Sequence, residues 1–187
     1  MTKLAHTLAP AAPATTREPR PFLFLEPRLA TAPAIDVAGR DLLEQLVADE
    51  IPALVRSLVN CTITLQNRRA LESGRQQPIA LSVLNRRRRV ARAWLLAIIA
   101  GGVDRTTLEL VSRTWLPTLA SAGPDRRYQP QFAIACVEFV RGAITALIFD
   151  QPCDNLLPAA HALCALETVL AVHLATLQLA TRAASAG

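Results

Sequence analysis

The sequence lacks the motifs that mark catalytic and metal-binding proteins. It contains no nucleophile elbow, no P-loop, no glycine-rich dinucleotide turn and no paired-carboxylate motif. Its cysteines, Cys61, Cys136, Cys153 and Cys164, show no C-x-x-C spacing and do not cluster with histidine, so no zinc site is predicted. Unpaired thiols are typical of a cytoplasmic protein. We therefore expect a cytoplasmic protein that is not an enzyme and holds no metal.

Aromatic and charged residues are also scarce, at 4% and 19% of the chain. Hydrophobic residues make up 51%, which is enough for a core and excludes global disorder. Leucine and alanine fill this interior in place of aromatic residues, and both favour helices. The composition therefore predicts an all-α fold, which the spacing of apolar residues divides into about six to seven helices.

Residues 1–34 differ from the rest of the chain by their prolines, which repeatedly interrupt any regular element. We interpret them as a flexible Pro/Ala-rich tail, and residues 35–187 as a single helical domain. Residues 22–25 form an apolar cluster inside the tail that has two interpretations. They pack on the domain just ahead of its first helix, or they dock on a partner.

The longest apolar run is residues 156–180, and a membrane span is one interpretation of it. The run contains Pro158, His161, Glu167 and His173, and a carboxylate such as Glu167 is unfavourable in lipid. We therefore expect a buried helix and no membrane span. A helix that is apolar nearly all round must bury more than one face, so it lies centrally or at a dimer interface.

Apolar residues three and four positions apart, together with caps and breakers, place the helices. Asp36 begins the first helix, Pro52 kinks it or starts another, and Pro117 bends a later one. Gly101 ends one helix and Asp104 caps the next. The expected helical segments are residues 36–52, 53–71, 78–100, 104–122, 130–149 and 155–182.

A run of arginines lies on one of these expected helices. Arg86, Arg87, Arg88 and Arg89 follow one another, and Arg92 lies about one turn further on. Successive helical residues point about 100° apart, so part of the run must reach solvent. We therefore predict a basic patch of these five arginines. It binds nucleic acid, an acidic partner or phosphate groups, or it is a solvated face with salt bridges to aspartate and glutamate.

Three stretches of the second half share a pattern of helix lengths, caps and apolar spacing. Residues 89–102 (RVARAWLLAIIAGG) lead into Asp104, residues 107–123 (TLELVSRTWLPTLASAG) end in glycine, and residues 155–179 (NLLPAAHALCALETVLAVHLATLQL) form the long apolar run. In this order they resemble the sensor-type globins that precede signalling domains in bacteria. The second stretch resembles the proximal helix of that family. The resemblance extends over residues 40–182 and implies a globin-like helical bundle.

The chain departs from this family at the metal ligand. The heme-binding members carry a histidine four residues before the glycine that closes the proximal helix, and Leu119 stands at that position. His161 and His173 lie twelve residues apart on the last expected helix, so they point about 120° apart and cannot both face one iron. The resemblance therefore implies a heme-free member. Heme held in an unusual way by His161 or His173 is an alternative.

Heme-free members of the sensor-globin group stand ahead of stress-response regulators or act alone as antagonists of sporulation sensor kinases. The resemblance implies a homodimer built on the last two helices, a signalling protein as partner, and an apolar pocket able to hold a fatty-acid-like ligand. The implied pocket residues are Trp94, Leu95, Ile98, Trp115, Leu119 and Phe132. The implied interface residues are Val140, Leu147, Leu163, Leu170 and Leu174.

We therefore expect a non-catalytic, heme-free sensor or regulatory domain that binds an apolar small molecule or a signalling partner and acts as a dimer. The first alternative is a basic helical protein that binds nucleic acid, or a subunit of a larger nucleoprotein complex. The second alternative is a heme-binding sensor with unusual ligation.

Overall fold

The computed structural model describes residues 35–72, 74, 78–122, 127–128, 130–150 and 156–185. The all-α prediction is confirmed for this part of the chain. The predicted tail, residues 1–34, lies outside the described residues.

The helices follow one another with short connections. They are α2 (Val37–Val47), the 3₁₀ turn η2 (Ala48–Glu50), α3 (Ile51–Glu72), α4 (Leu81–Ile99), α5 (Arg105–Leu110), the π-helical turn η3 (Val111–Trp115), α6 (Leu116–Ala120), α7 (Pro130–Phe149) and α8 (Leu156–Ser185). After α6, a two-residue antiparallel pair joins β1 (Ser121–Ala122) to β2 (Arg127–Tyr128).

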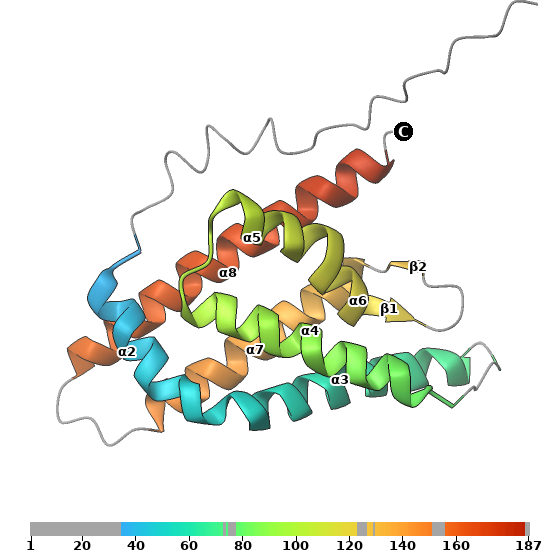
Figure 1. The fold of residues 1–187 in the computed structure, drawn as a ribbon, viewed down its shortest axis with the longest axis horizontal. Helices are drawn as coiled ribbons and strands as arrows, with labels where there is room; N and C mark the ends of the chain where they lie inside the picture. The colour runs from blue at the N-terminus through green and yellow to red at the C-terminus, as the bar shows by residue number, and fades with distance from the viewer. Residues whose placement is uncertain are drawn as a thin grey trace, which may run out of the picture.

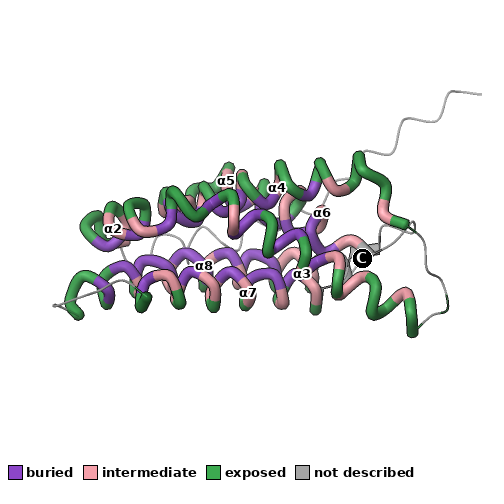
Figure 2. Tube along the Cα trace, turned by 90° about the horizontal axis from the view of Figure 1, so that it is seen from below, coloured by how far each residue is buried: buried purple, intermediate pink, exposed green. Residues whose placement is uncertain are grey.

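The helices form two layers with the core between them. Figure 2 shows α2, α4, α5 and α6 in one layer and α3, α7 and α8 in the other, and the buried stretches of both layers face each other. In Figure 1, α8 runs diagonally along the length of the molecule. It packs most extensively on α2 and α7, and it also contacts α4 and η3. The long apolar helix therefore takes a central position, one of the two that its composition predicts.

Several residues predicted to cap or end helices lie at helix boundaries in the structure. Asp36 caps α2 by accepting a hydrogen bond from the backbone N–H of Ala38 at 3.2 Å. Asp104 caps α5 by accepting a bond from the backbone N–H of Thr107 at 3.0 Å. Gly101 follows α4 with a φ of 70°, a left-handed conformation that strains a residue with a Cβ. These local signals therefore set the ends of three helices.

The start of α4 is one of the boundaries that differ from the prediction, because α4 begins at Leu81 and not at Pro78. Ala80 has extended backbone angles, with φ −60° and ψ 141°, and its carbonyl oxygen accepts the first helical hydrogen bonds from Val83 and Leu84. A proline marks the region in which a helix starts, but here the chain turns into the helix three residues later.

Pro117 is accommodated by the π-helical turn η3 between α5 and α6, whereas the sequence predicted a bend at this proline. Proline has no N–H, and its ring would collide with the carbonyl of residue 113 in a regular α-helix. The structure widens the preceding turn, so that the N–H of Leu116 donates to the carbonyl of Val111, five residues back. The five-residue spacing accommodates the proline ring without ending the helix.

Two of the helices are long and apolar enough to cross a membrane by length and composition, over Gln131–Phe149 in α7 and Leu156–Arg182 in α8. Core helices of globular proteins have the same properties, and part of each helix is buried inside this fold. The pair is therefore weak support for a membrane span.

The crossing of α2 and α8 leaves no room for a side chain at Gly39. A Cβ there would lie 2.4 Å from the carbonyl oxygen of His161 and 3.4 Å from the Cβ of Ala165. The side chain of His161 also pairs with Asp36, the cap of α2. This hydrogen bond lowers the pKa of the Asp36 carboxyl. The small residue and this hydrogen bond together fix where α2 lies on α8.

Replacing Gly39 with alanine tests this crossing. We expect Gly39→Ala to lower the free energy of unfolding by about 2 kcal/mol, because the new methyl group forces α2 away from α8. Urea denaturation followed by circular dichroism measures the change.

Gly142→Ala is the matched control. Gly142 is exposed in the middle of α7, and nothing lies within 4 Å of a Cβ built on it. Measured at a protein concentration at which the chain is monomeric, this variant should be as stable as the original or more stable by up to about 1 kcal/mol, because alanine favours a helix over glycine. Equal effects of the two substitutions would contradict the tight crossing.

Candidate functional site

The arginine run of α4 divides between the surface and the core. Arg86, Arg88, Arg89 and Arg92 are exposed, whereas Arg87 is only 2% exposed. The prediction of a five-residue basic patch is therefore wrong for Arg87. Its position follows from helical phase, because it lies on the same side of α4 as the buried residues Ala91, Trp94, Leu95 and Ile98.

The Arg87 guanidinium joins three segments. Its Nη2 donates to Oε1 of Gln66 on α3 and to the backbone carbonyl of Ser121 at the start of β1, each at 2.7 Å. Its Nε and Nη1 are buried and have no hydrogen-bond partner. The side chain is therefore only half satisfied, which makes it an expensive core residue.

The surroundings of Arg87 are apolar and contain a thiol. Burial lowers the pKa of Arg87, and burial raises the pKa of the Cys136 thiol on α7 to about 12. A thiol with such a pKa is protonated at neutral pH and is a poor nucleophile. Desolvation also raises the pKa of Cys61. Desolvation therefore disfavours the charged form of each of these side chains.

The four cysteines do not share one environment. Cys136 is buried, Cys61 is half-buried and Cys164 is exposed, and all three are free thiols. Cys153 lies outside the described residues. Cys164 is exposed although the sequence around it is apolar, because α8 turns that side of the helix outward.

The exposed arginines of α4 have no acidic neighbours. Over the described part of the chain, none of Arg86, Arg88, Arg89 and Arg92 forms an ion pair. No aspartate or glutamate occurs in the sequence between Glu72 and Asp104. The interpretation of this run as a face of internal salt bridges therefore has no support in the described structure.

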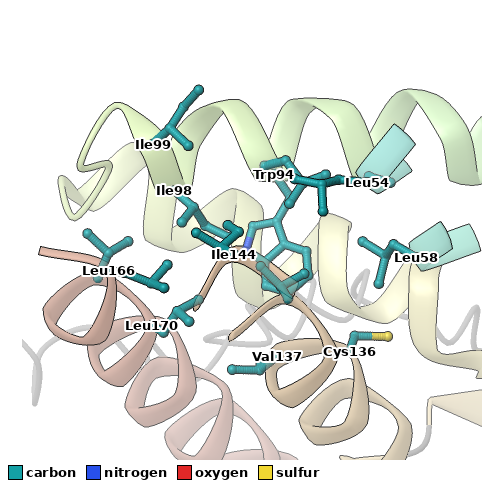
Figure 3. Packing of buried hydrophobic residues seen from close by; sticks show 14 of the residues in the cluster. Leu54, Leu58, Trp94, Ile98, Ile99, Cys136, Val137, Ile144, Leu166 and Leu170 are labelled. Atoms are coloured by element: carbon teal, nitrogen blue, oxygen red, sulfur yellow. The ribbon is translucent and has the colours of Figure 1, made fainter. Parts of the chain in front are cut away.

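The residues of the implied pocket lie together in the core. Trp94, Leu95, Ile98 and Leu119 are at most 1% exposed. Trp115 and Phe132 are half-buried and pack against the same cluster. Figure 3 shows Trp94 among apolar side chains from α3, α7 and α8, including Leu58, Ile144 and Leu170. The six residues therefore belong to one core cluster or pack against it, as close-packed side chains.

Trp94 also has a polar partner that the sequence pattern does not reveal. Its indole N–H donates to Nδ1 of His173 on α8 at 3.2 Å. Because Nδ1 accepts this bond, the ring proton of the neutral imidazole lies on Nε2, which donates to the carbonyl oxygen of Gly102 at 2.8 Å. His173 is 0% exposed, and this chain of two bonds satisfies both of its nitrogens.

The two histidines of α8 are therefore engaged in different places. His173 lies in the core between Trp94 and Gly102, and His161 lies at the surface against Asp36. Neither ring nitrogen of His173 is left for a metal. No group of three or more metal-ligating side chains occurs among the residues that the structure describes. His6 lies outside them.

Two of the implied interface residues lie inside the single chain. Val140 is 1% exposed and Leu170 is 0% exposed, and both belong to the core cluster. Leu147, Leu163 and Leu174 are half-buried and pack against that cluster. The implied interface is therefore corrected at Val140 and Leu170, because these positions point between the two layers and a second copy cannot reach them.

The pH dependence of stability tests the bonds of His173. Burial lowers the pKa of His173 below its usual 6.5. Below pH 6.5 the unfolded chain gains a proton at this residue that the folded chain resists, so the free energy of unfolding falls as the pH decreases. We expect a loss approaching about 1.4 kcal/mol per pH unit, the slope for one proton.

His173→Gln is the comparison variant for this measurement. A glutamine can accept from Trp94 and donate to the Gly102 carbonyl, but it does not titrate. Urea unfolding at pH 7.5 and pH 5.5 should show a smaller difference for this variant. An unchanged difference would mean that another group causes the pH dependence.

Because two nitrogens of Arg87 have no hydrogen-bond partner, we predict that removing its guanidinium does not destabilise the protein. Arg87→Met should leave the free energy of unfolding unchanged or raise it by about 1 to 2 kcal/mol, because it removes a buried charge with unpaired nitrogens. Gln66→Ala should lower it by about 1 to 3 kcal/mol, because it removes one of the two acceptors of Arg87. Thermal or urea unfolding measures both.

Arg88→Gln is the control from the same run. Arg88 is exposed, so its replacement should change the free energy of unfolding by less than about 0.5 kcal/mol. A loss for Arg87→Met as large as that for Gln66→Ala would show that the guanidinium stabilises the fold.

Comparison with known proteins gives no relative. The chain matches no family model, no curated protein and no solved structure.

Proposed function

We propose that this chain is a heme-free, globin-like regulatory domain that acts as a dimer and responds to an apolar small molecule or a signalling partner. The proposal rests mainly on the outer face of α7 and α8, which is nearly free of unpaired charge. The order of the helices in the two layers and the environment of Leu119 support it further.

The helix order is the first support. Two layers of helices around a core, with the first helix crossing the last, agree with a globin-like plan. Here α2 lies on α8, α4 lies on α3, and α3 and α8 both pack on α7. The proximal stretch α5, η3 and α6 lies in the same layer as α4 (Figure 2). Leu119, at the position of the missing ligand, is buried in the core.

The outer face of α7 and α8 is the main support. In Figure 2 no described helix lies beyond these two helices, so one side of each faces outward. Small side chains follow this side at spacings of three and four residues on α8 and of four and seven residues on α7. The exposed or half-buried residues are Ala135, Gly142 and Ala146 on α7, and Cys164, Thr168, Ala171 and Ala175 on α8. Small residues allow the helices of two copies to approach closely.

The charges on this face neutralise one another. Nη1 of Arg141 lies 2.7 Å from Oε1 of Glu138 on the same helix, and its Nε lies 3.1 Å from Oε1 of Glu167 on α8. The three side chains thus join α7 to α8 and leave only one net charge. A face of this kind can be covered by a second copy without burying isolated charges.

The end of α7 and the start of α8 add exposed apolar area. Phe149, Leu156 and Leu157 are 60%, 71% and 61% exposed. An open depression of about 360 Å³ lies at the end of α7, lined by Ala146, Leu147, Phe149 and Asp150. Large apolar side chains exposed together are typical of an interaction surface. They extend the proposed dimer face to the end of the helix pair.

The position of α8 suggests how a signal passes through such a dimer. One side of α8 carries the outer face, and the other side carries His173, which is bonded to Trp94 of α4. A ligand or partner that changes the distance between α4 and α8 must change this bond. The same movement changes the angle of α8 at the dimer face, so that binding and interface are linked.

A charge introduced on the outer face tests the dimer. Ala171 is exposed on α8, so Ala171→Glu should leave each chain folded but separate the dimer into monomers, because two carboxylates would be buried without partners. Light scattering after size-exclusion chromatography measures the mass, and circular dichroism checks the fold.

Ala48→Glu is the control, since Ala48 is exposed on η2 in the other layer. This variant should remain a dimer. A monomeric original protein, or a dimer that tolerates Ala171→Glu, would rule out the α7–α8 interface. Native mass spectrometry of the same samples shows whether the signal is a small molecule or a protein partner, because a bound small molecule adds a defined mass to the dimer.

A further inference from the structure

We infer that the exposed arginines of α4 form a binding face for the phosphates of double-stranded DNA, without preference for base sequence. This face consists of Arg86, Arg88, Arg89 and Arg92 and is called the α4 arginine face below. It lies on the opposite layer from the proposed dimer face (Figure 2), and the inference does not depend on that proposal.

The first argument is the absence of counter-charge. The four guanidinium groups are exposed, and none pairs with a described carboxylate. Arg68 and Arg105, which are also exposed, pair with Glu72 at 3.7 Å and with Glu109 at 3.4 Å. The exposed Arg56 and Arg69 of α3 form no ion pair with a described carboxylate either, so α4 is distinguished by four such arginines within seven consecutive positions.

The second argument is repulsion within the face. Residues three or four apart are neighbours on a helix, and like charges at these spacings destabilise it. Arg86 and Arg89, Arg89 and Arg92, and Arg88 and Arg92 are three such pairs. A bound polyanion removes this repulsion by placing phosphates between the guanidinium groups. The basic character of the whole chain, with a formal net charge of +5, favours the same class of ligand.

The third argument is the angular spread of the side chains. At about 100° per residue, Arg86 and Arg92 lie about 60° to either side of Arg89, and Arg88 lies beyond Arg92. An α-helix fits into the major groove of B-form DNA, which has phosphates along both walls. Arginines on both flanks of one helix match such a groove. The opposite side of α4, which carries Arg87 and Trp94, is buried.

The same geometry distinguishes DNA from other polyanions. The major groove of A-form RNA is too narrow to admit a helix. An acidic protein helix presents its carboxylates along one stripe and reaches only one flank of the face at a time. Since Arg89 is central and its two neighbours diverge, a two-walled groove satisfies more of the arginines at once.

The salt dependence of DNA binding is the sharpest test. Each phosphate contact contributes about −0.9 to the slope of log K against log salt, so four contacts predict a slope of about −3.6. Binding should then weaken by about 100-fold between 50 mM and 200 mM salt. The probe is a fluorescein-labelled DNA duplex of mixed sequence, about 20 base pairs long, followed by fluorescence anisotropy.

Single substitutions measure how much each arginine contributes to the slope of log K against log salt. Each of Arg86→Gln, Arg88→Gln, Arg89→Gln and Arg92→Gln should reduce its magnitude by about 0.9, and the combined variant should not bind the duplex. Arg87→Met is the matched control from within the run, because Arg87 is buried and cannot reach a phosphate. A second control is Arg105→Gln, which removes an exposed arginine paired with Glu109. Both controls should keep the original slope.

Three outcomes would overturn the inference. The first is no binding of the duplex at 50 mM salt by a folded protein. The second is an unchanged slope in the combined variant. The third is tighter binding of a polyglutamate peptide or of an RNA duplex of the same length than of DNA. Circular dichroism of each variant distinguishes loss of binding from loss of fold.

Discussion

The arrangement of the other helices is constrained by the need to bury the apolar surface of α8. Burial of one large apolar side chain contributes about 1.5 to 3 kcal/mol, more than a helix cap, which contributes about 1 kcal/mol. α8 carries several such side chains, including Leu166, Val169 and Leu170, all 0% exposed. α2 covers it at the glycine crossing, α7 lies beside it, and α5 covers its C-terminal half through Leu108, Val172 and Leu179. The side left uncovered is the one that the proposed dimer uses.

Two buried polar groups interrupt this apolar interior, and they differ in how well they are satisfied. His173 has a partner for each nitrogen and joins α8 to α4 and to the Gly102 turn. Such a network specifies one arrangement of the helices, because an alternative packing would leave two polar groups unpaired. Arg87 joins α3, α4 and β1, but two of its nitrogens have no partner. His173 therefore stabilises the contact between α8 and α4. Arg87 favours one arrangement of the segments that it joins but lowers the free energy of unfolding.

The arginine run shows where reasoning from sequence succeeds and where it ends. Helical geometry alone requires that four consecutive arginines point in different directions, and the sequence analysis predicts that part of the run reaches solvent. Arg87 shares the phase of the apolar residues Ala91 and Trp94, but its burial also depends on acceptors from α3 and β1, which only the packing of the helices brings to it. The implied dimer residues show the same limit, since Val140 and Leu170 belong to apolar helices but face the core. On a helix that is apolar all round, the residue type does not show whether a position faces the core or an interface.

The sequence by itself determined the all-α class and most helix boundaries, because caps and breakers act within a few residues. Asp36, Gly101, Asp104 and Pro117 each exert their effect through backbone hydrogen bonds or steric limits in the same turn of the chain. Tertiary structure decided which side of each helix is buried and which polar groups meet. Trp94 and His173 are 79 residues apart, and Arg87 and Ser121 are 34 apart. Contacts across such distances depend on how the two layers pack, and no local pattern encodes them.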